Sequence, residues 1–290
     1  MRTALMNKLE RASALDRVGD RLQPKVWSLL RPQRVKDALH GVWLGHPLHP
    51  VLVQIPIGAW ISSAVLDLMP AQRRMPGQQQ AATALVAVGA ASALPAALAG
   101  INDWSWLWQE ERRVGLVHAA TNTLAVALYT GSLAARLRGQ HGLGRTLGLF
   151  GLAAVSAGGY IGGHLVYKQT AQVNQGAPDM HRVEYGWRRV AEVDSLPEAQ
   201  LLARQVDNVP VVVYRDATDI TVMLGRCGHQ SGPLGQGKMI QVDGQACVVC
   251  PWHGSTFQLK DGKVVHGPCS TDQQVLPVRV VDGVLEARLP

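Results

Sequence analysis

The stretch Cys227-Gly228-His229, followed by Cys250-Pro251-Trp252-His253, decides the fold of the last third of this chain. Each arm carries one Cys and one His, and two thiolates with two neutral imidazoles can bind a metal centre. A zinc finger usually places its Cys pair on one arm and its His pair on the other. The mixed arms instead suit a two-iron cluster in which one iron takes both Cys and the other takes both His. A structural zinc site and a chance spacing are the alternatives.

Loops rich in Gly and Pro surround the two arms. Gly232-Pro233-Leu234 follows the first arm, Trp252 lies within the second, and Ser255 and Phe257 follow it, while Gly267-Pro268 forms a third loop. Such loops bring backbone N–H groups close to sulfide, and hydrogen bonds of this kind tune the potential of a cluster. We therefore expect these residues to form the immediate environment of the cluster.

These motifs resemble the Rieske [2Fe–2S] family, which has a C-x-H arm, a C-P-x-H-G arm and a proline loop. The resemblance covers residues 186–290 and implies that Cys227 and Cys250 hold the inner iron. It also implies that His229 and His253 hold the outer iron, which is the one reduced. From Trp187 onward, apolar runs alternate with Asp-Gly turns, which predicts a small antiparallel β domain.

The sequence departs from the high-potential members of that family at two places. Those proteins carry an additional Cys pair that forms a disulfide between the loops, but Gly232 and Trp252 stand at or near those positions here. Ser255 occupies the position of a Ser whose hydroxyl stabilises the reduced cluster, but Phe257 replaces the expected Tyr. The domain is therefore more similar to the ferredoxin-type Rieske of oxygenase systems. We expect a midpoint potential in the lower part of the ~−150 to +300 mV Rieske range.

The middle of the chain is apolar and contains almost no charge. Charged residues make up 17% of the whole sequence, against ~25% in ordinary soluble proteins. Membrane insertion explains this better than a soluble core does. The apolar stretches lie at residues 51–69, 81–101, 114–135 and 146–167. We predict an α-helical four-span transmembrane bundle followed by a small all-β antiparallel domain.

The predicted divisions are an amphipathic helical segment over residues 1–39, the four-span domain over 40–170, a linker over 171–185 and the β domain over 186–290. The first segment, broken near Pro24 and Pro32, lies on the membrane surface or packs on the protein or a second subunit. The net charge of +7 sits beside the apolar spans, which suits a lipid bilayer with anionic headgroups rather than nucleic acid.

Four spans place both termini on one side, and basic residues choose that side. We expect the N-terminus and the β domain to lie in the cytoplasm of a bacterium, with the spans in its plasma membrane. The basic residues counted near the membrane are Arg31, Arg34, Lys36, Arg112, Arg113, Lys168 and Arg182 on one face, and Arg73, Arg74, Arg136, Arg138 and Arg145 on the other.

Ionisable residues near the spans form a second candidate site. The residues on the side that carries the β domain are His46, His49, Asp103, His118 and His164. They could hold haem b or a metal ion, bind a quinone headgroup and move protons, or form a structural network at helix ends.

This half of the chain, over about residues 40–170, resembles the DUF2231 family of four-span bacterial membrane proteins. The matching residues are His46-Pro47-Leu48-His49-Pro50, Pro56-Ile57-Gly58, Asp67, Asp103-Trp104, His118 and His164. The resemblance implies a fold but no activity.

The leading hypothesis is a membrane-anchored Rieske protein that transfers one electron between a membrane or soluble redox partner and its acceptor. The rivals are a haem- or quinone-binding oxidoreductase that joins the His set to the cluster, and a redox sensor. A complete Rieske oxygenase needs two His and one carboxylate on a mononuclear iron, and only His266 follows the cluster motif. Cys247 is expected to pack in a strand, and Cys269 lies near the cluster or fills a small space. A homo-oligomer remains open.

Overall fold

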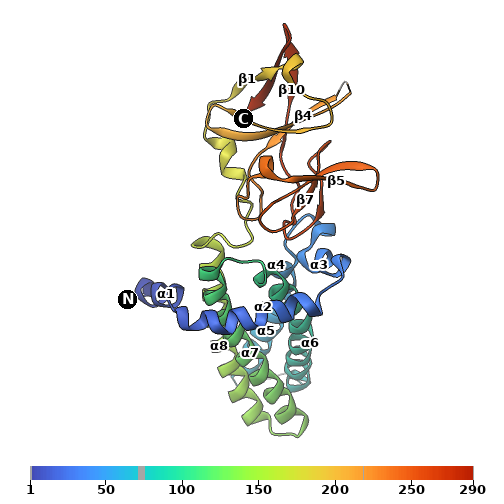
Figure 1. The fold of residues 1–290 in the computed structure, drawn as a ribbon. Helices are drawn as coiled ribbons and strands as arrows, with labels where there is room; N and C mark the ends of the chain where they lie inside the picture. Colours follow the sequence, from blue (N-terminus) through green and yellow to red (C-terminus); the bar gives the residue numbers. More distant parts are fainter. Residues whose placement is uncertain (1, 71–75, 218, 290) are drawn as a thin grey trace. The chain divides into compact units, whose positions relative to one another are not determined.

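The computed structural model describes residues 2–70, 76–217 and 219–289, and they form two compact units (Figure 1). The helical unit comprises Met1–Arg31 and Leu48–Ala171, and the β unit comprises Pro32–Pro47 and Gln172–Pro290. Arg73 and Arg74, which entered the count of basic residues, lie outside the described residues.

Long helices build the helical unit. They are α5 (Gln54–Leu68), α6 (Gln78–Trp104), α7 (Gln109–Leu137) and α8 (His141–Tyr167), preceded by the short α4 (Leu48–Leu52). Among the described residues, three helical segments are long and apolar enough to cross a membrane: Leu48–Leu68, α6 and α8. The remaining helix, α7, packs against both α6 and α8, and polar residues such as Thr121-Asn122-Thr123 reduce its hydropathy. Composition alone therefore supports three spans and not the predicted count of four.

The N-terminal helices α1 (Arg2–Glu10) and α2 (Asp16–Leu29) pack against α7. The guanidinium of Arg113 pairs with Asp16 at 2.6 Å, and that of Arg112 pairs with Asp20 at 3.0 Å. The predicted break at Pro24 is wrong, because α2 continues through it. These ion pairs, together with a 2.7 Å hydrogen bond from Gln23 to the Ser105 carbonyl, hold the part of the helix that precedes the missing N–H.

The β unit contains three antiparallel sheets. The first has the order β1 (Gly186–Glu192), β11 (Val284–Leu289), β10 (Val278–Val281). The second has the order β2 (Leu201–Val206), β3 (Val209–Asp216), β4 (Asp219–Leu224), β9 (Val275–Leu276). The third has the order β5 (Lys238–Val242), β6 (Gln245–Val249), β7 (Thr256–Gln258), β8 (Val264–His266). This confirms an all-β antiparallel domain after a helical region.

Turn chemistry fixes several connections in the β unit. Asp243-Gly244 and Asp282-Gly283 have positive φ at both residues, which is typical of the tight turns that join β5 to β6 and β10 to β11. Val275–Val281, which reads as one strand in the sequence, is divided at Pro277. Because proline has no N–H to donate, β9 pairs with β4 before it and β10 pairs with β11 after it.

The segment Pro32–Pro47 belongs to the β unit, although the sequence assigned residues 40–47 to the membrane domain. It contains α3 (Gln33–His40) and a 3-10 turn over Val42–Leu44. The carboxylate of Asp37 accepts hydrogen bonds from the His266 ring and from the Gly267 N–H, both at 2.9 Å. Val42 packs against the apolar core beneath the cluster motif.

Candidate metal centre

The two Cys-x-His arms lie in two loops of the β unit. The first arm follows β4, and its loop is closed by hydrogen bonds from Cys227 N to the Gly232 carbonyl at 2.8 Å and from Ser231 N to the Cys227 carbonyl at 2.9 Å. The second arm lies between β6 and β7, where Cys250 N donates to the Ser255 carbonyl at 2.8 Å. Both loops are therefore fixed by their own backbone.

The four side chains of the motif form two pairs, one from each arm in each pair. Cys227, Cys250 and His229 are 1%, 3% and 3% exposed, and the thiols of Cys227 and Cys250 are hydrogen-bonded. The rings of His229 and His253 have centroids 5.0 Å apart at 90°. The structure thus pairs the two thiols with each other and the two imidazoles with each other, across loops more than twenty residues apart.

His229 carries the clearest sign of a bound group. Both of its ring nitrogens are buried and have no hydrogen-bond partner among the described residues. A buried polar atom without a partner is costly, so a metal bond is a fitting use for one of them. Within the described ranges, no three His, Cys, Asp or Glu side chains converge on one ion. The pairing of Cys227 with Cys250 and of His229 with His253 fits two ligands for each of two irons.

The electrostatics prepare these groups to bind metal. The hydrogen bond with the Cys227 thiol lowers the pKa of Cys250 to about 6, with further lowering by the backbone N–H groups of Trp252 and His253. Burial lowers the pKa of His229 and that of His253, so both rings stay neutral and keep a lone pair for metal. The same N–H groups would donate to the Cys250 sulfur in a loaded site.

The residues around the arms explain the Gly-rich pattern. A Cβ on Gly232 would lie 2.6 Å from the Cys250 sulfur, so only glycine fits there. Leu234 and Phe257 are fully buried in the core below the site, whereas Trp252 is 47% exposed. The Ser255 hydroxyl is buried and accepts a 3.0 Å hydrogen bond from the Cys269 N–H. This bond ties the second arm to the Gly267-Pro268 loop.

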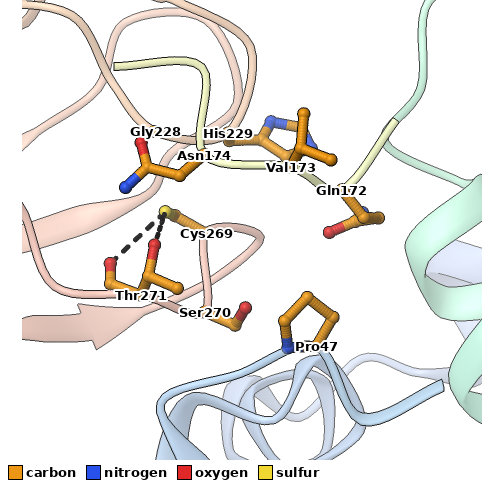
Figure 2. A pocket seen from close by; sticks show the side chains of 9 residues that line it. All are labelled: Pro47, Gln172, Val173, Asn174, Gly228, His229, Cys269, Ser270 and Thr271. Atoms are coloured by element: carbon orange, nitrogen blue, oxygen red, sulfur yellow. Dashed lines mark hydrogen bonds between the residues drawn. The ribbon is translucent and has the colours of Figure 1, made fainter. Parts of the chain in front are cut away.

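Sequence reasoning missed part of the surroundings. Figure 2 shows a pocket in the β unit that is lined by the His229 ring, the Cys269 thiol, residues of the expected linker and Pro47. Gln175 N donates to the Gly228 carbonyl at 2.8 Å, so the linker holds the first arm. The Cys269 thiol contacts the Thr271 carbonyl at 3.4 Å and is hydrogen-bonded with Cys227. Asp37 had no sequence signal, because it lies far from the motif in the chain.

The second candidate site is brought together only in part. The rings of His49 and His118 lie with their centroids 6.2 Å apart at an interplanar angle of 81°. His164 instead contacts a carboxylate oxygen of Glu10 at 2.8 Å. Asp103 is buried at the end of α6, and His46 belongs to the β unit.

Comparison with known proteins identifies both parts of the chain. Residues 186–278 match the Rieske [2Fe–2S] domain, and residues 45–175 match a predicted membrane protein family, DUF2231. The anthranilate 1,2-dioxygenase ferredoxin subunit of Burkholderia cepacia is 28% identical over 103 residues, which are 36% of this chain and 92% of the relative. A Rieske domain-containing protein of Homo sapiens is 31% identical over 87 residues, which are 30% of this chain and 55% of that protein.

Among solved structures, the ferredoxin of carbazole 1,9a-dioxygenase from Nocardioides aromaticivorans IC177 is 27% identical, with a TM-score of 0.31, and the match covers 37% of this chain and 99% of the ferredoxin. The protein therefore carries a Rieske domain joined to a DUF2231 membrane domain. Its Rieske domain implies a [2Fe–2S] cluster.

Proposed function

We propose that this chain is a membrane-anchored one-electron carrier whose redox centre is held by Cys227, His229, Cys250 and His253. The observation that carries the proposal is the pairing of Cys227 with Cys250 and of His229 with His253, in which all but His253 are buried and both nitrogens of His229 are unpartnered among the described residues. A [2Fe–2S] cluster bound there supplies a reversible one-electron couple. Neutral imidazoles on one iron lower the negative charge of such a centre, so an added electron is better tolerated.

The protein residues define how an electron enters and leaves. Cys227, Cys250 and His229 are buried, whereas His253 is partly exposed. The edge of His253 is therefore the side from which a redox partner approaches. Trp252, exposed beside it, adds an apolar surface for that contact.

The ferredoxin relatives suggest the kind of partner. The Burkholderia cepacia relative is, by name, a subunit of a dioxygenase, and a ferredoxin subunit passes electrons between proteins. We propose that this domain exchanges electrons with an oxidoreductase in the same way, from a membrane anchor. In this proposal the chain supplies electrons to such an enzyme and is not itself a complete oxygenase.

The helical unit serves as the anchor. In this proposal α7 crosses the bilayer beside the three more apolar segments, shielded by α6 and α8, so that four spans leave both termini on one side. The excess of basic residues that flank the spans on that side supports a cytoplasmic location for it. The apolar helices and the match to a predicted membrane domain support the anchoring itself.

Electron paramagnetic resonance of the reduced, membrane-bound protein tests this function. We expect a Rieske signal in carbonate-washed membranes, its loss in Cys227→Ser and Cys250→Ser, and its retention in Cys247→Ser, a buried thiol outside the motif. Addition of an oxidised one-electron acceptor should discharge the signal. A signal that persists in Cys250→Ser, or one found only in the soluble fraction, would contradict the proposal.

A further inference from the structure

The helical unit contains an internal repeat that residue identity conceals. His49, Trp60, Ser63 and Asp67 each lie 69 residues before a counterpart on α7, and these counterparts are His118, Tyr129, Ser132 and Arg136. On the partner helices, four α6 residues lie 62 residues before their α8 counterparts, which pairs Ala82 with Gly144, Gly89 with Gly151, Ala96 with Gly158, and Gly100 with Gly162. The two constant spacings match one helical hairpin to the next.

The contacts repeat together with the spacing. The Ser63 hydroxyl donates to the Ala82 carbonyl at 3.1 Å, and the Ser132 hydroxyl donates to the Gly144 carbonyl at 2.6 Å. The Trp60 ring lies against Gly89, as the Tyr129 ring lies against Gly151.

The contacts of the two histidines repeat in the same way. Nδ1 of His49 bonds the Ala96 carbonyl at 2.8 Å, and Nδ1 of His118 bonds the Gly158 carbonyl at 2.9 Å. Each ring lies against the glycine one turn further along, Gly100 for His49 and Gly162 for His118. The α4–α6 and α7–α8 hairpins are therefore two copies of one unit.

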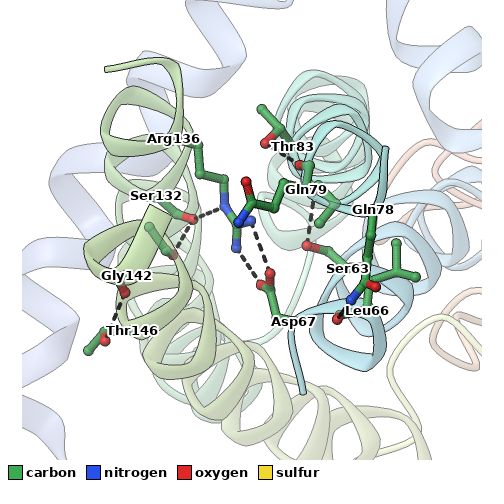
Figure 3. Close-up of polar contacts among 12 residues, drawn as sticks. Ser63, Leu66, Asp67, Gln78, Gln79, Thr83, Ser132, Arg136, Gly142 and Thr146 are labelled. Carbon is green, nitrogen blue, oxygen red and sulfur yellow. Dashed lines mark hydrogen bonds and ion pairs between the residues drawn. The ribbon is translucent and has the colours of Figure 1, made fainter. Parts of the chain in front are cut away.

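Matched residues meet across the interface between the copies. The rings of Trp60 and Tyr129 are stacked with centroids 4.1 Å apart at 4°. Asp67 and Arg136 form an ion pair at the far ends of their helices (Figure 3). Equivalent positions touch only where a two-fold axis passes between them. An internal pseudo-two-fold axis therefore runs through the His, aromatic and charged pairs, as in parallel-repeat membrane proteins.

We propose that His49 and His118 are the two axial ligands of a haem whose iron lies on this axis. Because each Nδ1 contacts a carbonyl oxygen, it carries the ring proton, and each Nε2 keeps its lone pair for metal. The amide nitrogen of Asn122 lies 3.4 Å from both nitrogens of His118. Because it is equally far from both, it does not lie along the lone pair of Nε2.

The separation of the rings fits this ligation. A metal–imidazole bond is ~2.0–2.1 Å, and a ring nitrogen lies about 1.1 Å from its centroid, so two rings on opposite sides of one metal have centroids about 6.3 Å apart. The observed separation is 6.2 Å.

The number of protein ligands selects haem over a bare cation. Among the described residues, no third His, Cys, Asp or Glu joins this pair to form a metal-binding group. A divalent cation held by two neutral rings between apolar helices would keep its full charge in a low-dielectric setting. A haem brings four further nitrogens and two negative charges, so two imidazoles complete its coordination.

Absorbance of the full-length protein, purified from cells supplied with a haem precursor, tests the site. We expect a Soret band and about one haem per chain by the pyridine haemochrome assay. His49→Ala and His118→Ala should each lower bound haem about ten-fold or more, whereas His164→Ala, which alters the ring that contacts Glu10, should retain it. His118→Met supplies a different axial ligand and should keep haem with a shifted spectrum and a raised potential.

The outcomes separate this site from the cluster. The Rieske signal of the same samples reports the β unit, so loss of haem with an intact Rieske signal concerns His49 and His118 alone. Haem retained in both His→Ala variants would overturn the proposal. Absence of haem from the wild-type chain, or a stoichiometric non-haem metal lost in His49→Ala, would overturn it as well.

Discussion

The ion pair between Asp67 and Arg136 offers a sharp test of the helical unit. The Arg136 side chain is 2% exposed and the Asp67 side chain is 12% exposed. The guanidinium contacts both carboxylate oxygens, one at 3.1 Å, and donates a further hydrogen bond to the Ser132 hydroxyl at 3.1 Å. Asp67→Asn removes the negative charge and leaves the buried guanidinium with neutral partners alone, the Ser132 hydroxyl and one amide oxygen.

The expected cost follows from that burial. Breaking a buried pair by removal of one partner costs about 3–5 kcal/mol, whereas replacing both partners by apolar residues is often close to neutral. Asp67→Asn should therefore lower the folded-to-unfolded ratio by a factor of about 10² to 4 × 10³, since ~1.4 kcal/mol corresponds to ten-fold. The double variant Asp67→Leu with Arg136→Met should recover most of the loss. The exchange Asp67→Arg with Arg136→Asp should recover part of it, because the repeat makes the two positions equivalent.

Denaturant unfolding in detergent, followed by tryptophan fluorescence, measures these differences. Arg138→Met is the matched control, because Arg138 is an exposed Arg at the same helix end and its loss should cost about 0.5 kcal/mol or less. If Asp67→Asn is no more harmful than the control, or if the effects of the double variant simply add, the reasoning fails.

Three further predictions concern the β unit. Gly232→Ala places a Cβ 2.6 Å from the Cys250 sulfur and should sharply lower iron content in the cluster. Gly159→Ala in α8, which meets nothing within 4 Å, should leave it unchanged, and equal cluster iron in both variants would refute the crowding. Asp37→Ala removes the acceptor of two 2.9 Å hydrogen bonds and should destabilise the β unit by about 1–3 kcal/mol, measured as a lower thermal midpoint that Asp37→Glu partly restores. Redox titration should give a midpoint in the lower part of the ~−150 to +300 mV Rieske range, raised in Phe257→Tyr by the added hydroxyl; a wild-type midpoint above about +200 mV would contradict this reading of the domain.

The Rieske domain was recognisable in the sequence because the residues of its motif lie close together in the chain. Cys227 and His229 lie within a few residues of each other, as do Cys250 and His253. The glycine at position 232 by itself indicates close packing. The strands and their Asp-Gly turns were readable for the same reason. The division of the strand at Pro277 was not predictable in this way, because the sequence of a strand does not specify which strand it pairs with.

Long-range contacts were out of reach. Asp37 contacts the proline loop 230 positions later, and no local pattern marks it. The proline in α2 is tolerated because Arg112 and Arg113, from another helix, hold its neighbours. The repeat in the helical unit is hidden because Trp60 matches Tyr129 and Asp67 matches Arg136. The two residues of each pair contact each other and are complementary in chemistry, but they are not the same residue type.

Joint quantification of iron and acid-labile sulfide in the anaerobically purified, detergent-extracted protein tests the central claim most directly. The proposal predicts equal amounts of iron in the cluster and sulfide, in the ratio of a [2Fe–2S] centre for each chain, once haem iron is subtracted. Both should fall together in Cys250→Ser. Stoichiometric zinc, with neither iron nor sulfide, would contradict the assignment of this protein as a membrane-bound Rieske electron carrier.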